Sequence, residues 1–178
     1  MNLPNKLTMS RIVAIPFFVI AMLIPTGWEG QKWLALAIFV LASLTDLVDG
    51  KIARSRGLVT NFGKFMDPLA DKLLVSSALI CLASQQRLAA WIVIVIIARE
   101  FIISGFRLVA VDAGKVIAAS MWGKVKTTFQ MIMVGLLIAD IPALAVVTQV
   151  AIWGALALTV ISLVDYLAKN AKLISDFK

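Results

Sequence analysis

The sequence contains no histidine and only one cysteine, Cys81. Zinc sites in proteins are built mainly from histidine and cysteine ligands, so this chain has no basis for one. A single cysteine cannot form a disulfide framework, and Cys81 stands in an apolar run where a small core residue is expected. We therefore expect neither a structural zinc nor redox chemistry.

Charged residues are also scarce, at 15% of the 178 residues against 61% hydrophobic ones. The mean hydropathy of +0.97 is far above what a soluble domain of this size needs, which indicates a membrane protein. The long apolar runs lack the alternation of barrel strands, so an all-α bundle is expected. No repeat, linker or low-complexity segment is evident, which predicts a single membrane domain over residues 1–178.

The acidic residues are outnumbered, with 10 against 17 basic ones and a net charge of +7. The basic residues stand at the ends of apolar segments, where they anchor helices and meet anionic headgroups. This placement favours membrane lipids as partners and argues against nucleic acid.

The apolar runs predict six transmembrane helices after a short interfacial helix at about residues 2–11. The expected spans cover about residues 12–25, 33–56, 62–84, 88–109, 121–139 and 141–166. The first span resembles a signal peptide, but no small-residue cleavage site follows it, so we expect it to be retained.

Six spans place both termini on one side of the membrane, and the basic residues indicate which side. That side holds 15 of the 17 Lys and Arg residues, and only Lys32 and Arg87 lie opposite. The positive-inside rule then predicts a multi-pass protein whose termini and functional aspartates face the cytoplasm.

Four aspartates are concentrated between residues 46 and 71 in the pattern D-x2-D-G-x2-A-R-x8-G-x3-D-x3-D. Spacings of three and four residues put each pair on one face of a helix. Four carboxylates at one point stay ionised only beside cations, and oxygen ligands favour Mg²⁺ or Mn²⁺. The alternative is that they are helix-end carboxylates that only cap and solvate membrane segments. The metal ligands we predict are Asp46, Asp49, Asp67 and Asp71.

This pattern matches the signature of the CDP-alcohol phosphotransferases, and three further stretches resemble the bacterial phosphatidylglycerophosphate synthases within that family. Those stretches are NLPNKLTMSRIVAIPFF, REFIISGFR and IAASMWGKVKTTFQM. The resemblance implies transfer of a phosphatidyl group from CDP-diacylglycerol to glycerol 3-phosphate in a bacterial cytoplasmic membrane. It also implies two metal ions at the four aspartates, Asp71 as the base, and a homodimer.

Three small residues and an arginine of the motif are candidates for the CDP-lipid site: Gly50, Ala53, Gly63 and Arg54. The small residues would let a nucleotide approach the backbone, although close helix packing explains them too. Arg54 could bind a phosphate or anchor at headgroups. Near the N-terminus, Asn5, Thr8 and Arg11 are candidates to border the nucleotide, and for Asn5 or Thr8 a helix cap is the alternative.

A second group of charges interrupts the apolar pattern further along the chain. Arg99 and Glu100 are adjacent, so on a helix they should point to different sides. The cations have too few acids nearby to balance them, and we predict that they bind the phosphate of the acceptor. The alternative is ordinary anchoring at the membrane surface. The four residues are Arg99, Arg107, Lys124 and Lys126.

Two other functions are compatible with these residues. A family member with a different acceptor, such as inositol phosphate, serine or phosphatidylglycerol, would keep the aspartates and change the basic cluster. A divalent-cation transporter would also place charges inside a helical bundle. Against transport, the aspartates lie near one face and no inverted repeat is visible.

Overall fold

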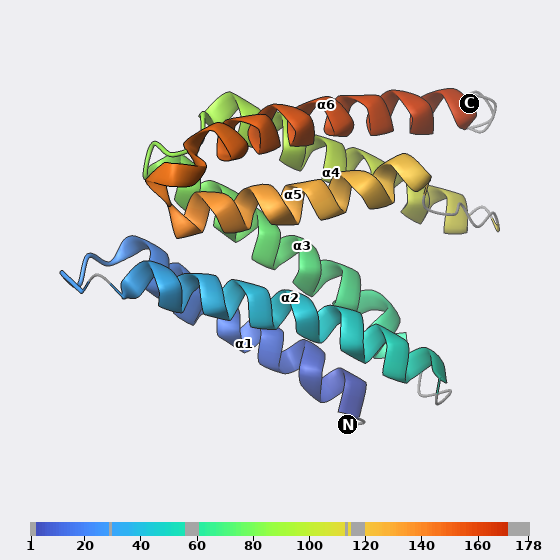
Figure 1. The fold of residues 1–178 in the computed structure, drawn as a ribbon. Coiled ribbons are helices and arrows are strands. Elements are labelled where there is room, and N and C mark those ends of the chain that lie inside the picture. The colour runs from blue at the N-terminus through green and yellow to red at the C-terminus, as the bar shows by residue number, and fades with distance from the viewer. Residues whose placement is uncertain (1–2, 29, 56–60, 113, 115–119, 171–178) are drawn as a thin grey trace. The chain divides into compact units, whose positions relative to one another are not determined.

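The computed structural model describes the chain except residues 1–2, 29, 56–60, 113, 115–119 and 171–178. Side chains at 3–4, 46–55, 61–62, 64–65 and 112 are also outside the described part. Within it the protein is all-α, and Figure 1 labels the helices. They are α1 (Leu3–Leu23), α2 (Gln31–Ser55), α3 (Asn61–Ser84), α4 (Ala90–Asp112), α5 (Met121–Ala139), the short 3-10 helix η1 (Pro142–Leu144) and α6 (Ala145–Lys169).

The helices follow the apolar runs closely. A helix satisfies the backbone N–H and C=O groups of such a run within the run itself, which an apolar surrounding requires. The predicted interfacial segment and first span form one helix, α1, without a break. Predicted spans two to five each lie within a few residues of α2 to α5, and the sixth begins with η1 before α6. Whether the chain is one domain stays a prediction, since its contacts separate two compact units.

Unit 1 comprises Met1–Leu88 and Gly135–Asp140, and α1 packs along both α2 and α3 in it. Its core pairs the rings of Phe18 and Phe39, whose centroids are 6.0 Å apart. Small buried residues such as Ala35 and Ala70 allow these helices to approach closely. This packing fixes the register of α1 against the aspartates of α3.

Unit 2 comprises Ala89–Val134 and Ile141–Lys178, and α4 packs on α6 in it. The Trp91 and Trp153 ring centroids are 6.3 Å apart. Ile96, Met133 and Ala155 are fully buried. This core also contains the buried charged side chains of Arg99 and Lys126, which are described with the site.

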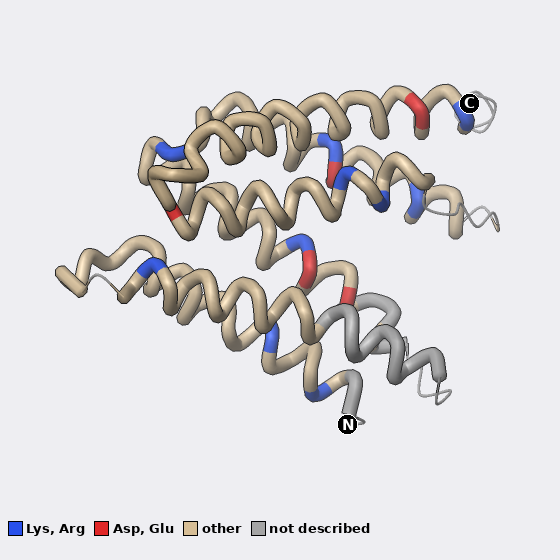
Figure 2. The backbone as a smooth tube through the Cα atoms, viewed as in Figure 1, with Lys and Arg blue, Asp and Glu red and all other residues tan. Residues whose placement is uncertain are grey.

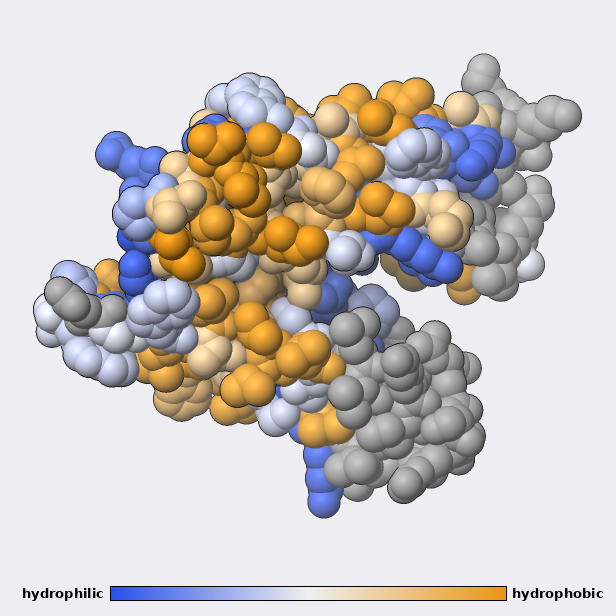
Figure 3. Space-filling model, in the orientation of Figure 1, coloured by the Kyte–Doolittle hydropathy of each residue, from blue (hydrophilic) through white to orange (hydrophobic). Residues whose placement is uncertain are grey.

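Large hydrophobic side chains cover much of the surface of the helices, as the orange regions over α1, α2, α5 and α6 show in Figure 3. Val146 is 77% exposed and Leu108 71%, which would be costly in water. Among the described residues, Asn5–Leu23 and Pro142–Lys169 are long and apolar enough to cross a bilayer, and Gln31–Thr45 is apolar but shorter. Helices α3, α4 and α5 are 24, 23 and 19 residues long and carry charged residues.

Candidate active site

Two of the four predicted metal ligands, Asp67 and Asp71, lie one turn apart on α3, and both are partly buried. The Thr8 hydroxyl of α1 donates a hydrogen bond to Asp67 Oδ1. Thr8 itself is fully buried. The first helix therefore holds one carboxylate oxygen in place and leaves the acid partly open.

The aspartates lie deeper in α3 than a helix N-terminus would favour. Because α3 begins at Asn61, Asp67 is its seventh residue and Asp71 its eleventh. The helix dipole stabilises anions only within about the first turn. Stabilisation of these two carboxylates must come from neighbouring donors and from cations.

The N-terminal half of α1 presents a buried polar face with a spacing of three residues, formed by Asn5, Thr8 and Arg11. Arg11 Nε donates to the carbonyl of Ala42 at 3.1 Å, which ties α1 to α2 four residues before Asp46. The capping alternative fails for Thr8, because the residue lies inside the helix and bonds to α3. Whether Asn5 and Thr8 border a nucleotide stays a prediction.

The remaining residues of the motif are placed by their backbone alone. The last turns of α2 carry Asp46, Asp49, Gly50, Ala53 and Arg54, whose side chains lie outside the described residues. Helix α2 ends at Ser55 and α3 begins at Asn61, so five intervening residues limit their separation to about 20 Å. Gly63 is buried at the start of α3. The chain topology thus brings both aspartate pairs toward the same end of unit 1.

Two of the four predicted metal ligands, Asp67 and Asp71, have described side chains at this end, so the metal site stays a prediction. Among described side chains, no group of three or more His, Cys, Asp or Glu residues gathers around one point. The donors that are described, Asp67 and Asp71, offer carboxylate oxygens, which is the donor set that Mg²⁺ and Mn²⁺ prefer. The chemistry of the residues therefore fits a hard divalent cation.

The predicted basic cluster belongs to unit 2, and its charged positions on α4 and α5 gather in the half away from η1 (Figure 2). The structure separates its members into two kinds. Arg99 and Lys126 are buried, at 7% and 1% exposure, whereas Arg107 and Lys124 are exposed.

Glu100 binds both buried cations. Arg99 Nη1 lies 3.1 Å from Glu100 Oε1, and the Lys126 ammonium donates to the same oxygen. Although adjacent residues start from different sides of a helix, the long side chains of Arg99 and Glu100 reach each other. Buried charges need such partners, so Glu100 stabilises this core.

Helix α6 adds a polar face to the same core. Arg99 Nε donates to Ser162 Oγ at 3.1 Å, and Arg99 and Arg107 both act electrostatically on the hydroxyl of Tyr166. Buried oxygens of Tyr166 and Gln130 have no hydrogen-bond partner among the described residues. Buried polar atoms are usually satisfied, so each of these oxygens is a candidate partner for water or a polar ligand.

The sequence interpretation missed two contributors to these sites, Ser162 and Gln130, and one contact of a third residue. Ser162 lies 63 residues from Arg99, and a serine in an apolar run gives no signal. Gln130 was also missed, although an amide at membrane depth is a signal that could have been followed. Thr8 was noticed, but its partner on α3 could not be inferred from spacing.

Comparisons with known proteins agree with the motif. A family model described as CDP-alcohol phosphatidyltransferase matches residues 1–161. A Bacillus subtilis CDP-diacylglycerol--glycerol-3-phosphate 3-phosphatidyltransferase is 49% identical, covering 95% of each chain. A probable phosphatidylglycerophosphate synthase of Mycobacterium tuberculosis is 41% identical over 94% of this chain and 81% of its own. A Haemophilus influenzae 3-phosphatidyltransferase with the same description as the Bacillus protein is 39% identical over 93% and 91%.

Proposed function

The chain belongs to the CDP-alcohol phosphatidyltransferase family, and we propose that it transfers the phosphatidyl group of CDP-diacylglycerol to glycerol 3-phosphate. The products are phosphatidylglycerophosphate and CMP, a step of phospholipid synthesis. Membership of a transferase family removes the cation transporter from consideration. The 49% identity over 95% of the chain to a relative with this printed activity favours glycerol 3-phosphate over other acceptors.

The observation that carries the proposal is the pair Asp67 and Asp71 on one face of α3, with Thr8 bonded to Asp67. In the reaction, a hydroxyl oxygen of the acceptor forms a bond to the phosphorus that carries the diacylglycerol. The bond from that phosphorus to the bridging oxygen breaks, and CMP leaves. We assign Asp71 to accept the proton of the attacking hydroxyl.

We assign Asp46, Asp49, Asp67 and Asp71 to hold two divalent cations, Mg²⁺ or Mn²⁺. When bound, such ions neutralise the diphosphate and make an acceptor hydroxyl more acidic. Thr8 would keep the Asp67 carboxylate oriented, since its hydrogen bond restricts rotation of the side chain. Gly50, Ala53, Gly63 and Arg54 remain the assigned neighbours of the CDP-lipid.

The four basic residues assigned to the acceptor phosphate divide into two pairs by their burial. Arg107 and Lys124 are exposed and suited to bind the phosphate of glycerol 3-phosphate, the arginine through its planar fork. Arg99 and Lys126 are engaged by Glu100, so we assign them to position this part of unit 2.

The protein is a membrane protein, and we propose that all six α-helices span the bilayer with the termini and aspartates on the cytoplasmic side. The exposed apolar side chains and the 15-to-2 division of basic residues support this orientation. A bacterial cytoplasmic membrane and a homodimer belong to the same proposal. Single cysteines at Ser55 and Gln86 in a Cys81→Ser background should label from opposite sides. Labelling of both from the periplasm would contradict the six-span topology.

One experiment tests the function directly. Purified protein in detergent is incubated with CDP-diacylglycerol, Mg²⁺ or Mn²⁺, and a panel of acceptors, and CMP release is measured. We expect release with glycerol 3-phosphate and little with glycerol, serine or inositol phosphate. Preferential release with any other acceptor would refute the substrate assignment while leaving the family unchanged.

A further inference from the structure

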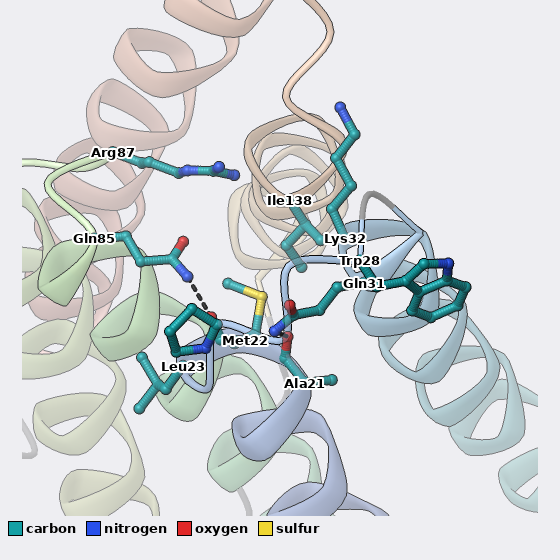
Figure 4. A pocket seen from close by; sticks show the side chains of 10 residues that line it. Ala21, Met22, Leu23, Trp28, Gln31, Lys32, Gln85, Arg87 and Ile138 are labelled. Atoms are coloured by element: carbon teal, nitrogen blue, oxygen red, sulfur yellow. Dashed lines mark hydrogen bonds between the residues drawn. The ribbon is translucent and has the colours of Figure 1, made fainter.

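A pocket of about 380 Å³ lies in unit 1, and Figure 4 shows residues that line it. It is formed by the last turn of α1, the start of α2, and residues that follow α3. Gln85 lies 14 residues after Asp71, which corresponds to about 21 Å along a helix. The pocket is therefore separate from the candidate active site.

Two cations that are 55 residues apart in sequence, Lys32 and Arg87, both line this pocket. Arg87 Nη2 lies 3.1 Å from Asp140 Oδ2, and Arg87 Nη1 donates to the Leu137 carbonyl at 3.3 Å. Lys32 Nζ donates to the Asp140 carbonyl at 3.3 Å. These contacts close the C-terminal end of α5, where cations are favourable.

Capping that helix end uses only some of the hydrogen-bond donors of Lys32 and Arg87. A guanidinium carries five N–H donors and an ammonium three, and Asp140 supplies one negative charge against two positive ones. The Arg87 side chain remains 34% exposed. Counted over the described residues alone, the pocket thus keeps a net positive charge and donors that can still bind an anion.

The pocket also contains Gln85, whose amide has both a hydrogen-bond donor and a hydrogen-bond acceptor. Gln85 Nε2 donates to the carbonyl of Met22, the dashed line in Figure 4. Its Oε1 is buried and has no hydrogen-bond partner among the described residues. A ligand with both an anionic group and a hydroxyl would satisfy the cations and this oxygen together.

The rim of the pocket indicates where such a ligand comes from. Trp28 lines the pocket and is 61% exposed, and the neighbouring Trp33 is 49% exposed. Tryptophan at helix ends is typical of the membrane interface, and Leu23 adds an apolar lining. A lipid would bury its chains against such a rim, whereas free phosphate would gain nothing from it.

We propose that this pocket binds the headgroup of an anionic phospholipid. Its phosphate lies at Arg87 and Lys32, and a headgroup hydroxyl donates to Gln85 Oε1. The hydroxyl-bearing headgroup of phosphatidylglycerol has this chemistry, and phosphatidylcholine, with a quaternary ammonium and no hydroxyl, does not. The lipid belongs to the leaflet on the side of Lys32 and Arg87, opposite the aspartates.

Quenching of tryptophan fluorescence by brominated lipids tests the proposal on the full chain in detergent micelles. Brominated phosphatidylglycerol should quench more than brominated phosphatidylcholine. The excess should disappear in Trp28→Phe and persist in Trp153→Phe, a control in unit 2. Trp33 does not serve as a control, because Lys32 Nζ lies 5.5 Å from its ring centroid. Equal quenching by both lipids, or an excess that survives in Trp28→Phe, would refute the site.

The cations are tested in the same assay. Lys32→Gln should weaken phosphatidylglycerol binding about tenfold, the lower end for one charged hydrogen bond, and Lys169→Gln should leave it unchanged. Because Arg87→Gln could disturb folding through Asp140, Gln85→Leu is the second variant, and it should reduce the preference for phosphatidylglycerol. Unchanged binding in both Lys32→Gln and Gln85→Leu would overturn the proposal. Displacement of the lipid by millimolar inorganic phosphate would instead identify a free-phosphate site and also overturn it.

Discussion

Charged side chains stand among apolar helices both at the acidic end of unit 1 and in the core of unit 2, but their described contacts differ. Asp67 and Asp71 carry charge of one sign, lie partly open, and have the Thr8 hydroxyl beside one of them. Arg99 and Lys126 are buried and share an internal counter-charge on Glu100. The first arrangement offers carboxylate oxygens, the donors that a hard divalent cation prefers, whereas the second contains a counter-charge of its own.

This difference separates residues that bind from residues that position. A carboxylate that binds a metal ion contributes to the reaction, and its removal should affect activity more than folding. A buried ion pair that is already satisfied contributes to the integrity of the protein, and its removal should do the reverse. The predictions below test this contrast, beginning with the largest effect.

Asp67→Asn should lower turnover by roughly 10²-fold or more, because loss of one metal ligand removes electrostatic stabilisation of the transition state. A chelator should abolish activity of the parent protein. The assay is CMP release at saturating CDP-diacylglycerol, and the thermal midpoint of Asp67→Asn should stay near that of the parent.

Variants of one distant acid and one contacting residue serve as controls for Asp67→Asn. Asp140→Asn removes an acid at the other end of unit 1 and should retain activity. Thr8→Val should cause a smaller loss than Asp67→Asn, and Thr8→Ser should restore most of it by keeping the hydroxyl. Near-parent turnover in Asp67→Asn would contradict the metal assignment.

Glu100→Gln should destabilise unit 2 by about 2 kcal/mol, because it leaves the Lys126 ammonium buried without its counter-charge. This value is below the 3–5 kcal/mol of fully buried pairs, since the Glu100 side chain is 22% exposed. The measurement is thermal unfolding in detergent. The double variant Glu100→Gln with Lys126→Met should recover part of the loss. A full loss that persists in the double variant would show that Glu100 acts through another partner.

Most of the fold could be predicted from the sequence, because apolar runs in a membrane chain leave the helix as the available structure. Residues 121–139 form α5 as predicted, and α2 to α4 differ by no more than a few residues at their ends. The break expected between residues 11 and 12 does not occur in α1, since Arg11 is buried against α2 and needs no interfacial position.

The sites could be predicted less well, because spacing along one helix does not reveal partners on another. The pair Asp67 and Asp71 follows from its spacing, but the bond of Thr8 to Asp67 depends on how α1 packs on α3. In the same way, four cations looked equivalent in sequence. Burial then distinguished Arg99 and Lys126 from Arg107 and Lys124.

Lys124→Ala should raise the KM for glycerol 3-phosphate about tenfold and leave the affinity for CDP-diacylglycerol nearly unchanged. An exposed lysine contributes at the lower end of the range for charged hydrogen bonds. Lys126→Met is the matched variant, and it should lower thermal stability with a smaller effect on KM. If Lys126→Met raised the acceptor KM more than Lys124→Ala, the division between binding and positioning cations would be wrong.

Of these variants, Tyr166→Phe should change activity and stability least. It tests whether the Tyr166 hydroxyl takes part in binding the acceptor phosphate. The Tyr166 side chain is buried, its hydroxyl has no hydrogen-bond partner among the described residues, and Arg99 and Arg107 act on it electrostatically. Removing an unsatisfied hydroxyl should leave thermal stability unchanged or slightly higher. If that hydroxyl donates to the acceptor phosphate, the KM for glycerol 3-phosphate should rise about three- to tenfold, in line with one neutral hydrogen bond. Thr159→Val removes another buried hydroxyl of α6, one that is already bonded to the Ala155 carbonyl, and should leave this KM unchanged. A drop in stability in Tyr166→Phe without a change in KM would assign the hydroxyl to the core, together with Arg99 and Lys126.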